Sequence, residues 1–153
     1  MRTRLTALAA AAAVATTLGL AGCSTTDAAS PAASTAVQGP GVAAPAPASP
    51  ERVDAASFAS VVDSPGVTII DVRTPEEFNA GHIDGAVNYN VQGPDFGAQI
   101  ATLDPAGTYA VYCQSGNRSQ VAVAQLSDAG VNGIYELETG ITGWANAGYP
   151  IVR

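Results

Sequence analysis

Three apolar runs between residues 67 and 137 have the pattern of buried β-strands. They are Val67–Val72, Thr108–Tyr112 and Val131–Leu137, each short and rich in β-branched or aromatic residues. Nearly continuous apolar runs are typical of strands in a parallel sheet that is covered on both faces. We therefore predict three central strands, and the segment Gly81–Asn88 adds a turn and one further short strand.

Helical segments with recognisable ends separate these strands. Helices are predicted over residues 54–62, from residue 74 onward, and over residues 95–103 and 119–129. Asp54 is the predicted N-cap of the first, Thr74–Glu77 forms a capping box for the second, and Gly130 closes the last. Strands that alternate with helices predict an α/β fold with a central, mostly parallel sheet flanked by helices on both faces.

The first 50 residues have a different pattern. Arg2 and Arg4 precede an uncharged run over residues 5–20, which is typical of a secretory signal and short for a membrane-spanning helix. Residues 24–50 hold five of the chain's ten prolines and no aromatic residue, so they cannot form a core. We predict a signal peptide over 1–22, a disordered tether over 23–50 and one folded domain over 51–153.

Leu20–Cys23 resembles the lipobox of bacterial lipoproteins. The resemblance implies that Cys23 is lipidated and becomes the new N-terminus, anchoring the domain to the extracytoplasmic face of a membrane, periplasmic or at the cell surface. An ordinary secretory signal that leaves Cys23 as a free thiol is the alternative. With Cys23 lipidated, Cys113 is the only thiol left in an oxidising compartment.

The net charge of the chain limits the classes of molecule that it can bind. The chain has 13 acidic and six basic residues, none of them lysine, and two of the basic ones lie in the predicted signal peptide. Nucleic acid and anionic lipid surfaces bind through clustered basic residues. The composition therefore argues against a nucleic-acid partner.

The segment Cys113–Ser119, called the cysteine loop below, carries the candidate chemistry. Its cysteine ends an apolar strand, and it continues as Gln114, Ser115, Gly116, Asn117, Arg118 and Ser119 into a predicted helix. Backbone N–H groups, a helix N-terminus and a guanidinium all favour a thiolate over a thiol, and the thiolate is the nucleophile. The sequence therefore predicts a reactive thiol in an anion-binding loop.

Four ordered segments resemble the rhodanese-like sulfurtransferases. They are Ile70–Arg73 with Glu76–Phe78, Gly81–Asn88, the cysteine loop, and Gly140–Pro150 with Trp144. The resemblance implies a single-domain form of that fold with Cys113 as nucleophile. It further implies transfer of a sulfane sulfur from a thiosulfate-like donor, through a Cys113 persulfide, to cyanide or a thiol, with no metal or organic cofactor.

Each loop residue has an expected role. Gly116 lets the backbone curl, and Asn117 tolerates the unusual backbone angles of a tight loop. Arg118 attracts the anionic donor and holds the loop, whereas Gln114 and Ser115 shape the pocket entrance and tune donor choice.

Charged residues near the loop are expected to have structural roles. Asp71 and Arg73 are predicted to form a charge pair that supports the site, and Glu77 to complete the capping box. His82 is the only histidine, and it is expected to serve the turn rather than the reaction.

Two alternatives remain open at this point. Phosphatases and arsenate reductases share the thiol-and-arginine arrangement, but in the related phosphatases the loop is one residue longer than the six residues from Cys113 to Arg118. A non-enzymatic persulfide carrier or redox sensor acting with a partner protein is the second alternative.

Overall fold

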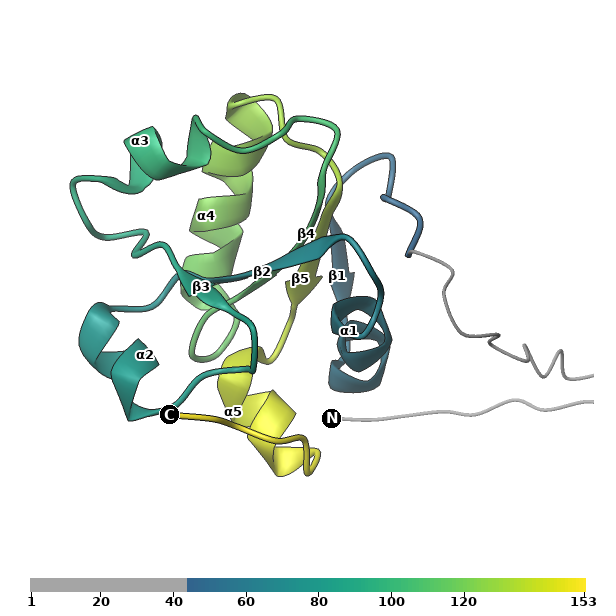
Figure 1. The fold of residues 1–153 in the computed structure, drawn as a ribbon, viewed down its shortest axis with the longest axis vertical. Helices are drawn as coiled ribbons and strands as arrows, with labels where there is room; N and C mark the ends of the chain where they lie inside the picture. Colours follow the sequence, from purple (N-terminus) through teal and green to yellow (C-terminus); the bar gives the residue numbers. More distant parts are fainter. Residues whose placement is uncertain (1–43) are drawn as a thin grey trace, which may run out of the picture. The chain divides into compact units, whose positions relative to one another are not determined.

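The computed structural model describes residues 44–153 and contains one five-stranded sheet (Figure 1). Its strands are β1 (Glu51–Val53), β2 (Val67–Asp71), β3 (Val87–Asn88), β4 (Thr108–Tyr112) and β5 (Ile134–Leu137). They lie in the order β1-β5-β4-β2-β3, and every neighbouring pair is parallel. The predicted parallel α/β sheet is confirmed.

Five helices connect the strands. They are α1 (Ala55–Val62), α2 (Pro75–Ala80), α3 (Phe96–Ile100), α4 (Asn117–Asp128) and α5 (Gly140–Asn146). The predicted caps of the first two are present: the Asp54 carboxylate accepts the Ser57 N–H at 2.8 Å, and Thr74 and Glu77 form a reciprocal capping box. These local signals suffice because each cap satisfies backbone groups within a few residues of itself.

Alternate strand residues face two separate apolar cores. Ile69 of β2 joins the core beneath α1 and α5, whereas its neighbour Ile70 joins the core beneath α3 and α4. Figure 1 shows α3 and α4 gathered on one side of the sheet and α1 and α5 on the other. Covering both faces explains why the central strands are apolar throughout.

Several predicted boundaries are wrong by a few residues. β5 begins at Ile134 rather than Val131, and residues 131–133 are irregular. Gly133 packs on the turn before β4, where a Cβ would collide with the Gly107 carbonyl. The helix predicted over 95–103 is limited to α3, and the Asp95 side chain makes no capping hydrogen bond. β1 and α5 are elements that the apolar pattern did not predict, since both are short.

The N-terminal predictions fall largely outside the described residues. The signal peptide over 1–22, the lipidated Cys23 and most of the tether lie there. Residues 44–50 contain no helix or strand, and the Pro45 carbonyl accepts a hydrogen bond from the Tyr135 hydroxyl at 2.6 Å. Within residues 44–153, no helix has the length and apolar character needed to cross a bilayer.

Candidate active site

The site lies at the carboxyl ends of β2 and β4, where parallel strands of an α/β sheet place ligand-binding loops. Asp71 is paired in register with Tyr112, and the Val72 N–H donates to the Tyr112 carbonyl at 3.0 Å. The residues that follow the two strands, Arg73 on one and Cys113 on the other, therefore emerge beside each other. The topology brings together segments that lie 40 residues apart in the sequence.

Helix α5 fixes the cysteine loop from one side. The N–H of Ile141 donates to the Cys113 carbonyl at 2.8 Å, and the N–H of Thr142 donates to the Gln114 carbonyl at 3.2 Å. Gly140, with a φ of 58°, permits this approach, because a Cβ there would collide with the loop backbone. α5 thus fixes the backbone at Cys113 and Gln114, and the Gly116 N–H that follows donates to the thiol sulfur.

Gly116 makes the turn from the loop into α4. Its φ of 88° is left-handed, and a Cβ at this position would collide with the Glu138 carbonyl. Asn117 is already the first residue of α4, so the unusual backbone angles expected for Asn117 are absent. The whole change of direction falls on Gly116, where only glycine fits.

The Cys113 side chain is buried among hydrogen-bond donors. The residue is 1% exposed, the Gly116 N–H donates to Sγ at 3.2 Å, and Sγ lies 3.4 Å from the Ser119 hydroxyl oxygen. Burial alone raises the pKa of the Cys113 thiol, but hydrogen bonds from Ser119, Ser115 and Gly116 outweigh it and lower that pKa below its usual value. The environment favours a thiolate nucleophile.

Asp71 and Arg73 form a buried ion pair beside the loop. Arg73 Nη2 lies 2.6 Å from Asp71 Oδ2, and the two residues are 4% and 0% exposed. The same guanidinium donates to the Gly81 carbonyl at 2.7 Å and to Gln114 Oε1 at 3.2 Å. Arg73 thus connects strand β2, the turn after α2 and the cysteine loop.

Arg118 is bound to α2 by a second ion pair. Its two terminal nitrogens donate to the two carboxylate oxygens of Glu77 at 2.7 and 2.6 Å. The Arg118 hydrogen bonds are the main reason that the pKa of Glu77 falls to about 2, and Glu77 raises the pKa of Arg118 in return. The sequence identified Glu77 only as half of the capping box, because its partner lies 41 residues away.

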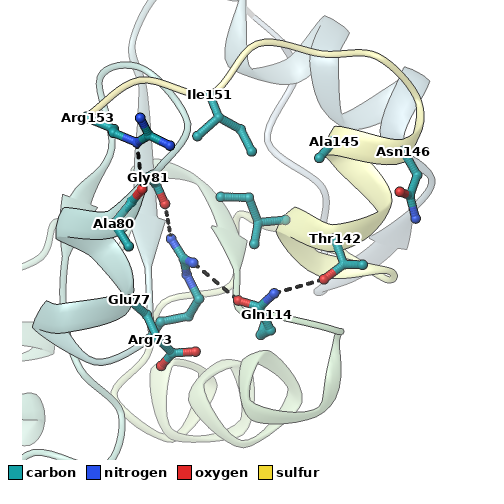
Figure 2. A pocket seen from close by; sticks show the side chains of 11 residues that line it. Arg73, Glu77, Ala80, Gly81, Gln114, Thr142, Ala145, Asn146, Ile151 and Arg153 are labelled. Atoms are coloured by element: carbon teal, nitrogen blue, oxygen red, sulfur yellow. Dashed lines mark hydrogen bonds between the residues drawn. The ribbon is translucent and has the colours of Figure 1, made fainter.

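A cavity of about 630 Å³ opens beside the cysteine loop (Figure 2). It is lined by Arg73, Glu77, Ala80, Gly81, Gln114, Ile141, Thr142, Ala145, Asn146, Ile151 and Arg153. Gln114 is the loop residue at its wall, held between Arg73 and the Thr142 hydroxyl, as Figure 2 shows. Its wall combines charged and polar side chains with the aliphatic side chains of Ile141, Ala145 and Ile151.

The remaining loop residues differ in their distance from the thiol. Gly116 and Ser119 contact Sγ, whereas Gln114 faces the cavity and Arg118 faces α2. Ser115 and Asn117 are exposed, and Ser115 contributes through its backbone. Among residues 44–153, no three His, Cys, Asp or Glu side chains are grouped closely enough to hold a metal ion.

Sequence reasoning missed two residues near the thiol. Glu136 of β5 is 2% exposed and accepts a hydrogen bond from the Ser119 hydroxyl at 2.6 Å. Arg52 of β1 forms an ion pair with the other Glu136 oxygen, also at 2.6 Å. An acidic residue inside an otherwise apolar strand was the available signal, since such residues are rarely buried without a partner.

Comparison with known proteins agrees with this geometry. Residues 54–147 match the family model described as a rhodanese-like domain. This chain belongs to the rhodanese-like family. The match covers both strands that carry the site, the cysteine loop and the whole of α5.

Relatives of this rhodanese-like chain include named enzymes. It is 39% identical over 95 residues to thiosulfate sulfurtransferase 16, chloroplastic, of Arabidopsis thaliana, covering 56% of this chain and 79% of that protein. It is 33% identical over 100 residues to thiosulfate sulfurtransferase GlpE of Tolumonas auensis, covering 65% of this chain and 91% of that protein.

Solved structures give the same fold. The crystal structure of a rhodanese-related protein from Thermoplasma volcanium matches with a TM-score of 0.59 and 34% identity, covering 67% of this chain and 97% of that one. The resemblance stated from the four sequence segments is confirmed at the level of family and fold.

Proposed function

We propose that this rhodanese-like domain is a sulfurtransferase that carries a sulfane sulfur on Cys113. The observation that carries the proposal is the position of Sγ, 3.2 Å from the Gly116 N–H and 3.4 Å from the Ser119 hydroxyl, in a loop whose carbonyls are bound by α5. The names of the two relatives support the same reaction class.

The proposed reaction has two steps. In the first, the Cys113 thiolate attacks the outer sulfur of a thiosulfate-like donor, forming an S–S bond while the donor's own S–S bond breaks and sulfite leaves with its electron pair. In the second, cyanide or a thiolate attacks the outer persulfide sulfur and Cys113 leaves as a thiolate. Sulfur is transferred without an external oxidant or reductant.

The same hydrogen bonds support both charged forms of the cysteine. Donors fixed before the reaction stabilise an anion without rearranging, and a persulfide places its outer sulfur about 2 Å beyond Sγ. The thiol is 1% exposed, which favours a small donor over a bulky one. The loop from Cys113 to Arg118 has six residues, which suits the outer sulfur of a persulfide, whereas the related phosphatases surround a tetrahedral phosphate with a loop that is one residue longer.

We also propose that the domain is anchored by lipid on Cys23 at the extracytoplasmic face of a membrane. The lipobox-like Leu20–Cys23 supports this proposal, and the proline-rich segment that follows would separate the domain from the bilayer. The test is membrane fractionation. We expect detergent, but not salt, to release the wild-type chain from membranes, and we expect Cys23→Ala not to bind membranes.

The sulfur-transfer proposal is tested by turnover. The purified full chain is incubated with thiosulfate and cyanide, and the formation of thiocyanate is measured over time. We expect steady turnover with the ping-pong kinetics of a two-step reaction, abolished in Cys113→Ser. Hydrolysis of a phosphate ester without thiocyanate formation would overturn the proposal. Formation of a persulfide that only a protein acceptor discharges would instead identify a carrier.

A further inference from the structure

A continuous chain of hydrogen bonds joins Cys113 to a buried carboxylate that the proposed reaction does not use. Sγ of Cys113 lies 3.4 Å from Ser119 Oγ, which donates to Glu136 Oε1 at 2.6 Å. All three side chains are buried, at 1%, 0% and 2% exposure. Ser119 therefore stands between two acidic groups that are shielded from water.

The geometry follows from strand alternation. Ile134 of β5 faces the core beneath α4, and Glu136, two residues later, points to the same face. Ser119 lies in the first turn of α4, and Cys113 directly follows the neighbouring strand β4. The sheet thus brings three side chains from separate elements into one line.

The number of hydrogens limits what Ser119 can do. A serine hydroxyl has one hydrogen to donate, and both a thiolate and an ionised carboxylate can only accept. The hydroxyl can therefore serve the thiolate or the carboxylate, but not both. The short 2.6 Å contact shows that in this structure it serves Glu136, leaving its lone pairs to the thiol hydrogen.

Two other charged side chains, Arg52 and Glu138, influence the ionisation of Glu136. Arg52 of β1 contacts Oε2 at 2.6 Å and favours the carboxylate, while Glu138, just past the end of β5, disfavours it. Arg52 is 48% exposed, so its charge is partly screened by water. Burial raises the pKa of Glu136, and the hydrogen bond from Ser119 and the charge of Arg52 oppose that rise.

We propose that Glu136 is a positioning residue that controls the protonation of Cys113 through Ser119. As a carboxylate, Glu136 holds the only hydroxyl hydrogen of Ser119, so that a Cys113 thiolate is left with backbone N–H donors alone. As a carboxylic acid, it donates to Ser119 Oγ and releases that hydrogen to the thiolate. This inference deepens the proposed sulfur transfer and rests on Cys113 being its nucleophile.

The exchange between the two states balances without an added reactant. The S–H bond of Cys113 breaks and its proton passes to Ser119 Oγ, while the original hydroxyl proton passes to Glu136 Oε1. The net charge of the three groups is unchanged, and the negative charge has moved from the carboxylate to the sulfur. Glu136 thus supplies an internal acceptor for the thiol proton at a site with almost no exposure to solvent.

The test is the pH dependence of Cys113 alkylation by iodoacetamide in the full chain. Peptide mass spectrometry separates the Cys113 product from that of Cys23. Glu136→Gln preserves the shape, and its amide can donate to Ser119 Oγ, which frees the hydroxyl hydrogen for the thiolate. We expect the alkylation midpoint to move down by about one pH unit, equivalent to about a tenfold larger thiolate fraction below the midpoint.

Two controls separate this effect from the loss of a negative charge. Glu138→Gln removes an exposed carboxylate near the same loop, and we expect the midpoint to move by only a few tenths of a pH unit. In a Ser119→Ala background, Glu136→Gln should move the midpoint clearly less than it does in wild type, because the connecting hydroxyl is gone and only the direct effect of the charge is left. An unmoved or raised midpoint in Glu136→Gln, or an equal shift with and without Ser119, would overturn the proposal.

A second variant guards against misfolding. Glu136→Met fills a similar volume without a charge, and Arg52 can extend into solvent; the same downward shift is expected. The titration uses no sulfur donor, so it is independent of the proposed turnover. If the wild-type chain did not accept sulfur, the proposed function would be wrong. If the chain accepted sulfur but the alkylation midpoint of Glu136→Gln did not move, only the proposed role of Glu136 would be wrong.

Discussion

Two arginine–carboxylate pairs flank the cysteine loop and differ sharply in burial. Asp71 and Arg73 are 0% and 4% exposed, and the guanidinium also serves the Gly81 carbonyl and Gln114. Glu77 and Arg118 are 31% and 26% exposed, and the two terminal nitrogens of Arg118 donate to the two carboxylate oxygens of Glu77. The distances within the pairs are alike, so the difference lies in the surroundings.

The difference in burial indicates that the Asp71–Arg73 pair is a fixed structural support, whereas the Glu77–Arg118 pair can open. A buried charge that loses its partner is left uncompensated, so Asp71 and Arg73 are fixed to each other. Arg118 is partly solvated, and water or an incoming anion can replace Glu77 at little cost. The expectation that Arg118 attracts an anionic donor is compatible with this pair, because Glu77 already presents the charge and shape of a bound anion.

Removing the charge of Asp71 is predicted to have the largest effect. Asp71→Asn leaves the buried Arg73 without a counter-charge, which costs about 3–5 kcal/mol of unfolding free energy. Glu77→Gln is the matched variant: glutamine retains the capping box, and the partly exposed pair is screened by water, so the loss should be clearly smaller than that of Asp71→Asn. Urea denaturation measures both. Equal losses would show that the two pairs do not differ in the way their burial indicates.

Removing Arg118 is predicted to affect sulfur loading more than stability. Arg118→Ala should slow persulfide formation from thiosulfate by about 10–100-fold, the equivalent of one hydrogen bond to a charged group. Arg118→Lys keeps the charge but loses the two-pronged geometry, and an intermediate rate is expected. Rapid-quench measurement of loading, alongside urea denaturation, tests the pair. If Arg118→Ala formed the persulfide at the wild-type rate, the role of Arg118 would be structural only.

The smallest predicted effect is a pH dependence of stability. The pKa of Glu77 is lowered from 4.5 to about 2 in the folded chain. A lowered carboxyl pKa stabilises the fold above pH 4.5, and this stabilisation disappears as the pH falls toward 2. The advantage of wild type over Glu77→Gln should therefore shrink between about pH 5.5 and about pH 2.5. An advantage that stays constant or grows on acidification would contradict the assignment.

The sequence predicted those parts of the molecule that depend on near neighbours. The caps at Asp54 and Thr74, the apolar strands and the position of Cys113 all rest on residues within one turn or strand of each other. Family resemblance supplied the connection between the four segments. The short elements β1 and α5 had too few residues for a periodic pattern.

The partners of the site could not be predicted in the same way. Glu77 and Arg118 are 41 residues apart, and Ser119 and Glu136 are 17 apart. Such contacts depend on the register of neighbouring strands and on the faces from which side chains project. The capping box also offered a sufficient explanation for Glu77, which concealed its second role.

Intact-mass spectrometry of the full chain after exposure to thiosulfate is the most direct test of the central claim. We predict a mass increase of one sulfur atom that maps to Cys113, disappears when cyanide is added with formation of thiocyanate, and is absent in Cys113→Ser. An unchanged mass under conditions where Cys113 still reacts with iodoacetamide would contradict the claim that this cysteine accepts a sulfane sulfur.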